Sequence, residues 1–339
     1  MFKVVYMKPE YNIINLSDLI NSYPELDDFI NGTDDIAKIF DFKVNIDPER
    51  KNKYKRIYEG IGNTCVYNVR LNNNNLLKIK MEYTNPMGNS HYSRFWIPYL
   101  YISEILGKIK PNDTILEITS GNSGLALAMA AKELNFKLKI LVPEILPAKR
   151  IEPMEHFGAE IIKTKGYVKE CIYRLRKELV KHKEYVITNH SEEKSDFIIK
   201  IMKRIGHEYF TKNGIPDYIL SGIGNGTSTL ALYDYFGNKQ KKPKYIGYYP
   251  KTDEKAITFG LYKNNTPLRH VPVAIEKSDR IFSNEIFNID KIREIFKYDS
   301  EIYNLGHSTL YGIAIAMHLA EEVRNQTFLL IGYDKNDRY

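Results

Sequence analysis

The sequence has only two cysteines, Cys65 and Cys171, among its 339 residues. Two cysteines are too few for a disulfide framework, and no C-x-x-C pair or His, Asp and Glu cluster has the spacing of a metal site. Apolar runs such as 125–131 are far shorter than the roughly 20 residues of a membrane span. The first residues, "MFKVVYMKPEYN", lack the features of a signal peptide. We therefore expect a soluble, cytoplasmic protein without a membrane partner or a metal.

The sequence also lacks a concentrated basic face. Its formal charge of +7 is spread over short runs such as "RKNKYKR" and "KQKKPK", without interleaved aromatic residues. Such runs are typical of solvated loops and helix ends, and a small net charge gives non-specific attraction without a binding site. We expect no nucleic-acid partner.

What is present is a regular alternation of strand-like and helix-like segments from about residue 114. It begins "TILEIT", "GLALAMAAKELN", "LKILVP", "AKRIEPMEHFG" and continues to "DYILSG", "TSTLALYDYF" and "KYIGYYP". Repeated strand–helix units predict mostly parallel sheets covered by helices, an α/β fold. Because ligands bind beyond the carboxyl ends of parallel strands, the loops that follow Thr119 and Ser221 are the places to look for a site.

Two polar loops follow strands at these places. "TSGNSG" (119–124) lies between a strand and an apolar helix, where backbone N–H groups and hydroxyls suit a carboxylate or phosphate. "SGIGNGTST" (221–229) has glycines that let the backbone approach a phosphate closely. Helix caps and tight turns use the same residues, but one cap does not need six of them, and two such loops on one sheet favour an anion site.

These motifs occur in one order over about 57–339, together with "IGNT" (61–64), "KMEYTNPMGNSH" (80–91), "HFGAEIIKT" and "DKNDRY". In this order they resemble the fold-type II pyridoxal-phosphate enzymes, and cysteine synthase most closely. The resemblance implies two domains with the ligand cleft between them: a large domain (56–94 and 190–339), a smaller mobile domain (95–189) and an N-terminal extension (1–55). It also implies a homodimer.

The resemblance also implies roles for the two loops. The first loop would hold the carboxylate of an amino-acid-like ligand, with its asparagine beside the ring hydroxyl of the cofactor; its residues are Thr119, Ser120, Gly121, Asn122 and Ser123. The second would hold a phosphate, of the cofactor or of a ligand, through Gly222, Gly224, Asn225, Gly226, Thr227 and Ser228.

Two positions depart from the family pattern. The lysine that binds the cofactor covalently is replaced by His91, and the polar residue beside the pyridine nitrogen by Lys335. An imidazole cannot form the covalent imine, and a charged lysine cannot accept a hydrogen bond from a pyridinium. Lys80 is the nearest substitute amine, but its expected strand position makes it a poor one.

The histidines need an ordinary structural explanation beside the functional one. A lone histidine is often a hydrogen-bonded structural residue, and only the position of His91 raises it above that background. Ser308, and less so His307, are second-tier candidates for lining the cleft, whereas His156 and His318 have the pattern of structural or surface residues.

Three functions remain open at this point. The first is a divergent cysteine-synthase-like enzyme that acts on an amino-acid-like or phosphorylated molecule without a covalent pyridoxal-phosphate linkage, with His91 as general acid or base near neutral pH. The second is a conventional pyridoxal-phosphate enzyme of β-elimination or β-replacement. The third is a catalytically silent ligand-binding or regulatory protein.

Overall fold

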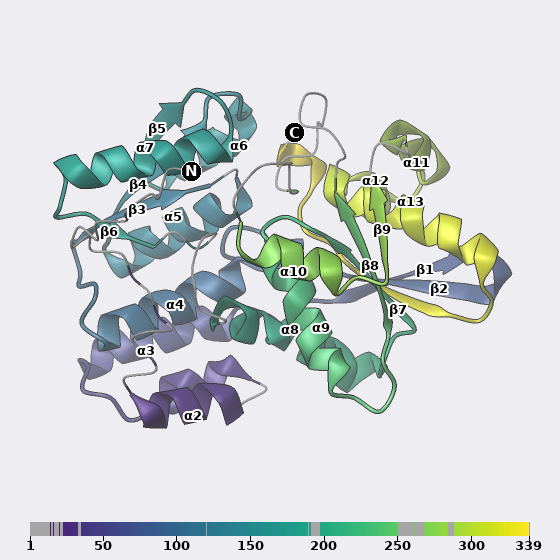
Figure 1. Ribbon diagram of the computed structural model, residues 1–339, viewed down its shortest axis with the longest axis horizontal. Helices are drawn as coiled ribbons and strands as arrows, with labels where there is room; N and C mark the ends of the chain where they lie inside the picture. Colours follow the sequence, from purple (N-terminus) through teal and green to yellow (C-terminus); the bar gives the residue numbers. More distant parts are fainter. Residues whose placement is uncertain are drawn as a thin grey trace, which may run out of the picture.

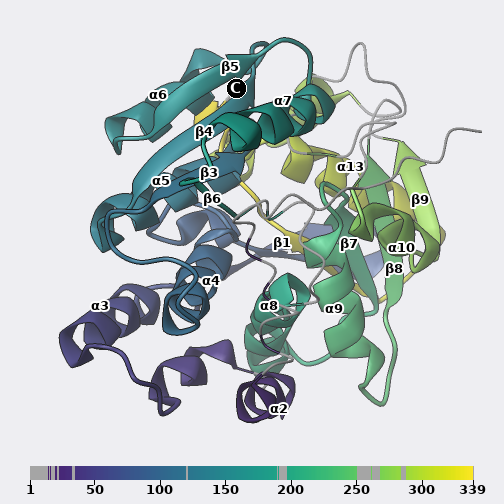
Figure 2. The ribbon, with the colours of Figure 1, turned by 60° about the vertical axis from the view of Figure 1, so that its left-hand side comes forward.

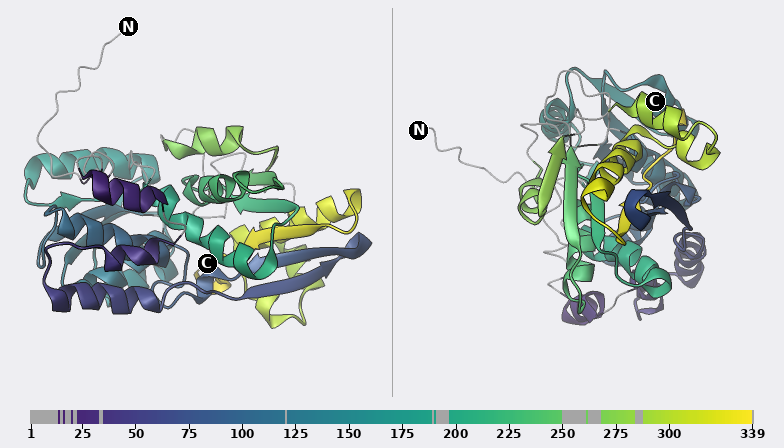
Figure 3. Two further views of the ribbon diagram at one scale, coloured as in Figure 1. Left: turned by 90° about the horizontal axis from the view of Figure 1, so that it is seen from below. Right: turned by 90° about the vertical axis from the view of Figure 1, so that its right-hand side faces the viewer.

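The computed structural model describes residues 14, 16, 20, 23–32, 35–119, 121–188, 190, 197–249, 261, 268–283 and 288–338. Its strands form two sheets that lie side by side along the long axis of the molecule (Figures 1 and 3). The larger sheet contains, in spatial order, β1 (Val66–Leu71), β2 (Asn75–Lys80), β10 (Thr327–Ile331), β7 (Tyr218–Gly222), β8 (Lys244–Tyr249) and β9 (Arg280–Ser283). The smaller sheet contains β5 (Glu160–Thr164), β4 (Lys137–Pro143), β3 (Thr114–Ile118) and β6 (Val186–Ile187).

Helices surround both sheets, and α4 packs against both α5 and α8, so that it joins the helical layers of the two lobes (Figure 2). The α-helices are α2 (Pro24–Gly32), α3 (Pro48–Glu59), α4 (Ser93–Ile105), α5 (Asn122–Leu134), α6 (Ala148–His156), α7 (Val168–Lys181), α8 (Phe197–Asn213), α9 (Thr227–Gly237), α10 (His270–Glu276), α11 (Ile289–Ile295), α12 (Ser300–Tyr303) and α13 (His307–Glu322). Short 3₁₀ helices are η1 (Ile36–Asp41), η2 (Asn72–Asn74), η3 (Glu82–Thr84) and η5 (Asn336–Arg338). None of the described helices is both long and apolar enough to span a membrane.

The strand pairing confirms the predicted α/β fold. Every pair in both sheets is parallel except the hairpin β1–β2. The strands within 114–187 form the smaller sheet and the others form the larger one. The two polar loops therefore follow strands of different sheets, β3 and β7, and do not share one sheet as we expected. The boundaries themselves, the mobility of the smaller domain and the N-terminal extension, of which only part is described, stay predictions.

Asparagine supplies the turns of this chain. All seven non-glycine residues with positive φ in the described ranges are asparagines, a residue that tolerates the left-handed region better than most. Asn73 and Asn74 turn the β1–β2 hairpin, and the side chain of Asn75 bonds to the backbone at Ala320 and Val323. The hairpin turn and the end of α13 therefore lie together, away from the smaller sheet (Figure 1).

The last strand enters the middle of the larger sheet. β10 pairs in parallel with β2 on one side and with β7 on the other. Because parallel strands end at the same sheet edge, the residues that follow β10 meet those that follow β2 and β7. The C-terminal segment is thereby placed beside the glycine-rich loop, and η5 contacts α6 of the other lobe (Figure 2).

A buried ionic cluster ties β2, η3, α4 and α8 together. Arg94 is fully buried and donates two hydrogen bonds to Glu82 and two to Glu208, at 2.7–2.8 Å. Lys80 adds a contact of 2.9 Å to Glu208. Burial alone would raise the pKa of Glu82, but the charge and hydrogen bonds of Arg94 and the charge of Lys80 outweigh it and lower this pKa to about 2. Arg94 also lowers the pKa of Glu208, so both carboxylate partners of Arg94 are charged in the fold at neutral pH.

We expect Arg94→Met to lower the free energy of unfolding by about 3–5 kcal/mol, because it leaves two buried carboxylates without their cation. Arg280→Met is the matched control: it removes an Arg–Glu pair whose side chains are both 45% exposed, and should cost less than about 1 kcal/mol. Urea denaturation at pH 7 measures both. Similar losses in the two variants would show that the cluster does not carry this stability.

Candidate functional site

His91 lies in a tight turn between η3 and α4. A Cβ at Gly88 would lie 2.5 Å from the backbone of Ala126 in α5, and Gly88 has φ +76°, so only glycine fits there. The hydroxyl of Ser93 donates to the carbonyl groups of Met87 and Ser90 at the start of α4. The turn is therefore fixed against the smaller sheet's helices, and it fixes the position of His91.

The imidazole of His91 is buried and neutral at neutral pH. It is 7% exposed, and its Nδ1 has no hydrogen-bond partner among the described residues. Burial, with smaller contributions from the charges of Arg94 and His190, lowers the pKa of His91 to about 4, against the opposing charge of Glu82. The near-neutral titration that we expected from the unperturbed value therefore does not hold, because the side chain is almost entirely removed from water.

Tyr333 connects His91 with the glycine-rich loop. Its ring meets the imidazole edge-on, with 5.4 Å between centroids. Its hydroxyl accepts a hydrogen bond from the N–H of Gly222 at 3.1 Å and shares another with the Ser221 hydroxyl at 3.2 Å. The phenol is thus bound to the base of the loop predicted to hold a phosphate.

The glycine-rich loop keeps its close-approach geometry. Gly226 has φ +86°, and a Cβ there would lie 2.8 Å from the carbonyl oxygen of His270. The Oδ1 of Asn225 accepts hydrogen bonds from the N–H and hydroxyl of Thr227, whereas its Nδ2 is buried without a partner among the described residues. Among the groups predicted to contact a phosphate, Thr227 and the N–H of Gly222 already form hydrogen bonds within the protein. The Nδ2 of Asn225 remains as a donor without a partner among the described residues. Ser228 lies close enough to Tyr333 to influence its phenol, and Gly224 is half-buried.

The first loop divides its predicted residues into two groups. The hydroxyl oxygen of Thr119 accepts from the N–H groups of Gly121 and Gly124, both at 3.1 Å. Ser123 is buried and accepts from the indole Nε1–H of Trp96, through its carbonyl at 2.9 Å and its hydroxyl at 3.1 Å. These two side chains therefore hold the loop in shape. Ser120 lies outside the described residues.

Asn122 is the loop side chain that reaches toward the larger sheet. Its Nδ2 donates to the Oδ2 of Asp334 at 3.0 Å, and Nη2 of Arg150, in α6, lies 3.3 Å from the same oxygen. Sequence analysis missed Arg150, Tyr333 and Asp334. Applying the strand-end rule to "TFLLI", the last strand, would have pointed to the two residues shortly after it.

Lys335, which the resemblance sets beside the pyridine nitrogen of the cofactor, has its side chain at the surface of the structure. It is exposed, and its Nζ lies over the ring of Tyr83, 4.9 Å from the centroid. Side chains alternate along an extended segment, so that Asp334 is buried where Lys335 turns outward. Lys80 is no free amine, because its Nζ donates to Glu208 and to two oxygens of Thr64.

The second-tier residues lie at the start of α13. The backbone carbonyl of Ser308 accepts from the hydroxyl of Tyr248 at 2.8 Å. Burial, followed by the charges of Arg293 and Arg150, lowers the pKa of His307 to about 4. His307 therefore lies near Arg150, whereas His156 and His318 are exposed.

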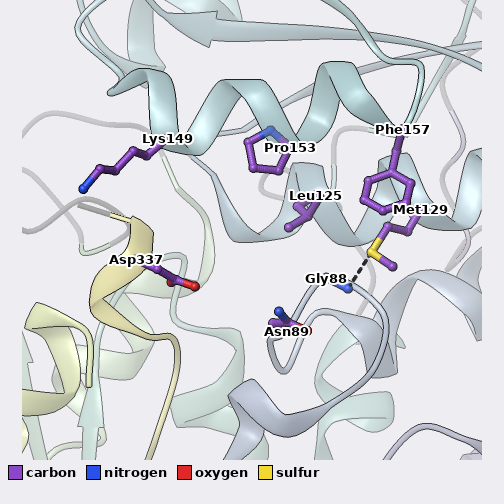
Figure 4. Close-up of a pocket in the computed structure, with 8 residues that line it drawn as sticks. All are labelled: Gly88, Asn89, Leu125, Met129, Lys149, Pro153, Phe157 and Asp337. Atoms are coloured by element: carbon purple, nitrogen blue, oxygen red, sulfur yellow. Dashed lines mark hydrogen bonds between the residues drawn. The ribbon is translucent and has the colours of Figure 1, made fainter. Parts of the chain in front are cut away.

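A cavity of about 300 Å³ opens behind the His91 turn (Figure 4). Gly88, Asn89, Leu125, Met129, Lys149, Pro153, Phe157 and Asp337 line it, and the side chains of Lys149 and Asp337 stand on its rim in Figure 4. Neither His91 nor the glycine-rich loop belongs to its lining. The cavity therefore adjoins the predicted site without coinciding with it.

Known proteins with similar sequences point to one family. Residues 57–294 match the family described as pyridoxal-phosphate dependent enzymes. The chain is 26% identical over 300 residues to cysteine synthase B of Pseudomonas aeruginosa, which covers 85% of this chain and 96% of that protein. It is 27% identical over 312 residues to cysteine synthase of Buchnera aphidicola subsp. Schizaphis graminum, covering 84% and 94%.

Solved structures share the fold. O-ureido-L-serine synthase superposes with a TM-score of 0.73 at 20% identity, over 84% of this chain and 92% of that one. The O-acetylserine-dependent cystathionine beta-synthase from Helicobacter pylori gives a TM-score of 0.73 at 22% identity, over 84% and 96%. At this identity the likeness establishes the architecture alone.

The described residues do not fit a covalently held pyridoxal phosphate. His91 offers no primary amine, and Lys80 is held in the ionic cluster. The phenol of Tyr333 is bound at Gly222, at the base of the loop that would take the phosphate. These residues therefore offer no free amine for the linkage, and the protein's own phenol bonds to the base of the loop predicted to take the phosphate.

We expect added pyridoxal phosphate to give no visible band of a lysine-bound cofactor, and borohydride to leave no lysine adduct in a mass spectrum. His91→Lys supplies an amine but keeps the Tyr333 phenol in place, so the double change His91→Lys with Tyr333→Ala is the informative comparison. Because Lys335 is at the surface, replacing it should not change whether the band of a lysine-bound cofactor forms. A borohydride-reducible band in the wild-type protein would contradict this prediction.

Proposed function

Because the chain belongs to the pyridoxal-phosphate-dependent enzyme family, we propose that it is a divergent, cysteine-synthase-like enzyme that has lost the covalent linkage to that cofactor. In this proposal it acts on an amino-acid-like or phosphorylated small molecule held by the 119–124 and 221–229 loops. His91 is its proton acceptor. The homodimer implied by the resemblance and the cytoplasmic location expected from the sequence stay predictions, and light scattering at micromolar concentration checks the first.

The observation that carries the proposal is the position of His91. Its ring contacts Tyr333, which is bonded to the glycine-rich loop, and the next residue, Asp334, is bonded to Asn122 of the first loop. The imidazole is thus linked through two consecutive residues to both predicted ligand loops. Its Nδ1 is buried without a hydrogen-bond partner among the described residues, so it is an atom to which a ligand could bond.

A bound anion would improve the basicity of this imidazole. A pKa of about 4 makes His91 a weak proton acceptor in the empty site, because burial disfavours its charged form. A ligand whose negative charge lies against the imidazole itself would raise that pKa toward the working pH. Acid–base chemistry at His91 would therefore start only when the ligand is in place.

A catalytically silent binding protein is the second candidate, and one observation favours it. The protein's own groups, the Tyr333 phenol and the Asp334 carboxylate, already bond to both loops. In that case the protein still binds a ligand but does not convert it into a product. The conventional pyridoxal-phosphate enzyme is the least supported of the three functions, because His91 has no primary amine and Lys80 is held in the ionic cluster.

We expect His91→Ala to lower turnover at least about 100-fold, the usual scale for a lost general base, while ligand affinity stays within a few-fold. O-acetyl-L-serine and O-phospho-L-serine are the probes, and release of acetate or phosphate without added cofactor is the readout. His318→Ala, at an exposed histidine of α13, is the control and should leave the rate unchanged. Binding without turnover in the wild type selects the silent protein.

The pH profile provides an independent check on His91. With a pKa of about 4, the imidazole of the free protein stays neutral from pH 8 down to about 5. The value of kcat/KM should therefore not fall through the ordinary histidine range near 6.5. A wild-type break near pH 6.5 that is absent in His91→Ala would mean that His91 titrates normally and that its burial has been misjudged.

We expect Asn122→Ala to weaken ligand binding by about 1.5–3 kcal/mol, the scale of a hydrogen bond to a charged group. Trp96 is the only tryptophan, and its indole is bonded to Ser123, so its fluorescence reports on this loop. Titration with L-serine measures the affinity. Unchanged affinity in Asn122→Ala would mean that the loop is purely structural.

A further inference from the structure

The first loop was predicted to bind a carboxylate, and in the structure it does bind one: that of Asp334. Asn122 donates to its Oδ2 at 3.0 Å, and Nη2 of Arg150 lies 3.3 Å from the same oxygen. The side chains of Arg150 and Asp334 are each 2% exposed. A buried guanidinium and an amide thus converge on one carboxylate oxygen, and the three residues come from α6, α5 and the segment after β10.

Two glycines shape this position. A Cβ at Gly121 would lie 2.5 Å from Nη1 of Arg150, and Gly121 has φ +146°. A Cβ at Gly306 would lie 1.9 Å from Oδ1 of Asp334. These glycines immediately precede α5 and α13, whose N-terminal ends carry partial positive charge. Guanidinium, amide and two helix starts therefore surround one small anion-sized position.

The contact at this position is weaker than the structural ion pairs of the same protein. Arg94 meets Glu82 and Glu208 through four hydrogen bonds of 2.7–2.8 Å, in the range of strong charge-assisted bonds. The Arg150–Asp334 distance is 3.3 Å and involves one carboxylate oxygen. By distance, the Arg150–Asp334 pair is therefore looser than the pairs of the Arg94 cluster.

We propose that Arg150 and Asn122 form an anion subsite for the carboxylate of a small ligand, and that Asp334 is an internal competitor that fills the subsite until the ligand displaces it. The assignment of Arg150 deepens the proposed function and rests on it for the amino-acid-like nature of the ligand. The anion subsite itself does not depend on that nature. Displacement would also release a link between the C-terminal segment and the two helices of the smaller sheet's lobe.

The test is a titration with sodium acetate at constant ionic strength, balanced with sodium chloride and followed by Trp96 fluorescence. Asp334→Asn keeps the shape but removes the competing charge. If Asp334 fills the subsite about nine-tenths of the time, its removal should strengthen acetate binding about tenfold. Lys149→Gln, which removes a positive charge one residue from Arg150, is the control and should behave like the wild type.

The double variant Arg150→Gln with Asp334→Asn tests the guanidinium. Arg150→Gln alone leaves a buried carboxylate without its cation and can unfold the protein, whereas the double variant leaves a neutral pair. We expect it to lose the acetate affinity that Asp334→Asn gains. Acetate binding that is equal in the wild type and Asp334→Asn, absent in both, or retained in the double variant would overturn the proposal.

A second titration separates this proposal from the proposed function. L-serine replaces acetate in the same three proteins. Tenfold tighter binding of both compounds to Asp334→Asn supports the two proposals together. If acetate gains affinity and L-serine does not bind, the anion subsite stands and the amino-acid-like ligand is wrong.

Discussion

The rest of this site depends on the ion pairs that the buried guanidinium of Arg94 makes with Glu82 and Glu208. The guanidinium neutralises Glu82 and Glu208, and with Lys80 it joins the end of β2 to α4 and α8. In the sequence, the His91 turn lies between two members of that cluster, Glu82 and Arg94. Because breaking any one charge would leave others buried without partners, this turn is held in one place. The same cluster engages Lys80, the lysine nearest to the turn in the sequence that could have replaced the missing amine.

The C-terminal strand gives the site its second constraint. By pairing between β2 and β7, β10 delivers Tyr333 and Asp334 to the edge of the larger sheet where the 221–229 loop opens, within reach of the 119–124 loop, which follows β3 of the smaller sheet. Tyr333 bonds to one loop and Asp334 to the other. Two consecutive side chains of the protein itself, a phenol and a carboxylate, therefore link the two predicted ligand loops.

Glu82 and His91 are both buried, but their charged neighbours differ. Glu82 is buried beside cations, so its charge is retained and its pKa falls to about 2. His91 is buried with little compensating charge, so its charge is lost and its pKa falls to about 4. The difference comes from the neighbours, since both groups are removed from water. An anionic ligand in contact with the imidazole would supply the charged neighbour that His91 lacks.

The sequence by itself determined the α/β fold and placed the two polar loops at strand ends, because strand–helix alternation and glycine-rich turns are local patterns. That His91 takes the place of the family's lysine stays a prediction from the resemblance. The sequence did not reveal that Thr119 and Ser123 serve the loop, that Lys335 turns to solvent, or that Arg150 and Asp334 meet. Those outcomes depend on contacts between residues far apart in the chain, such as the 184 positions that separate Arg150 from Asp334. Only the tertiary structure decided them, because the insertion of β10 into the sheet sets which side chains meet, and burial sets which of them keep their charge.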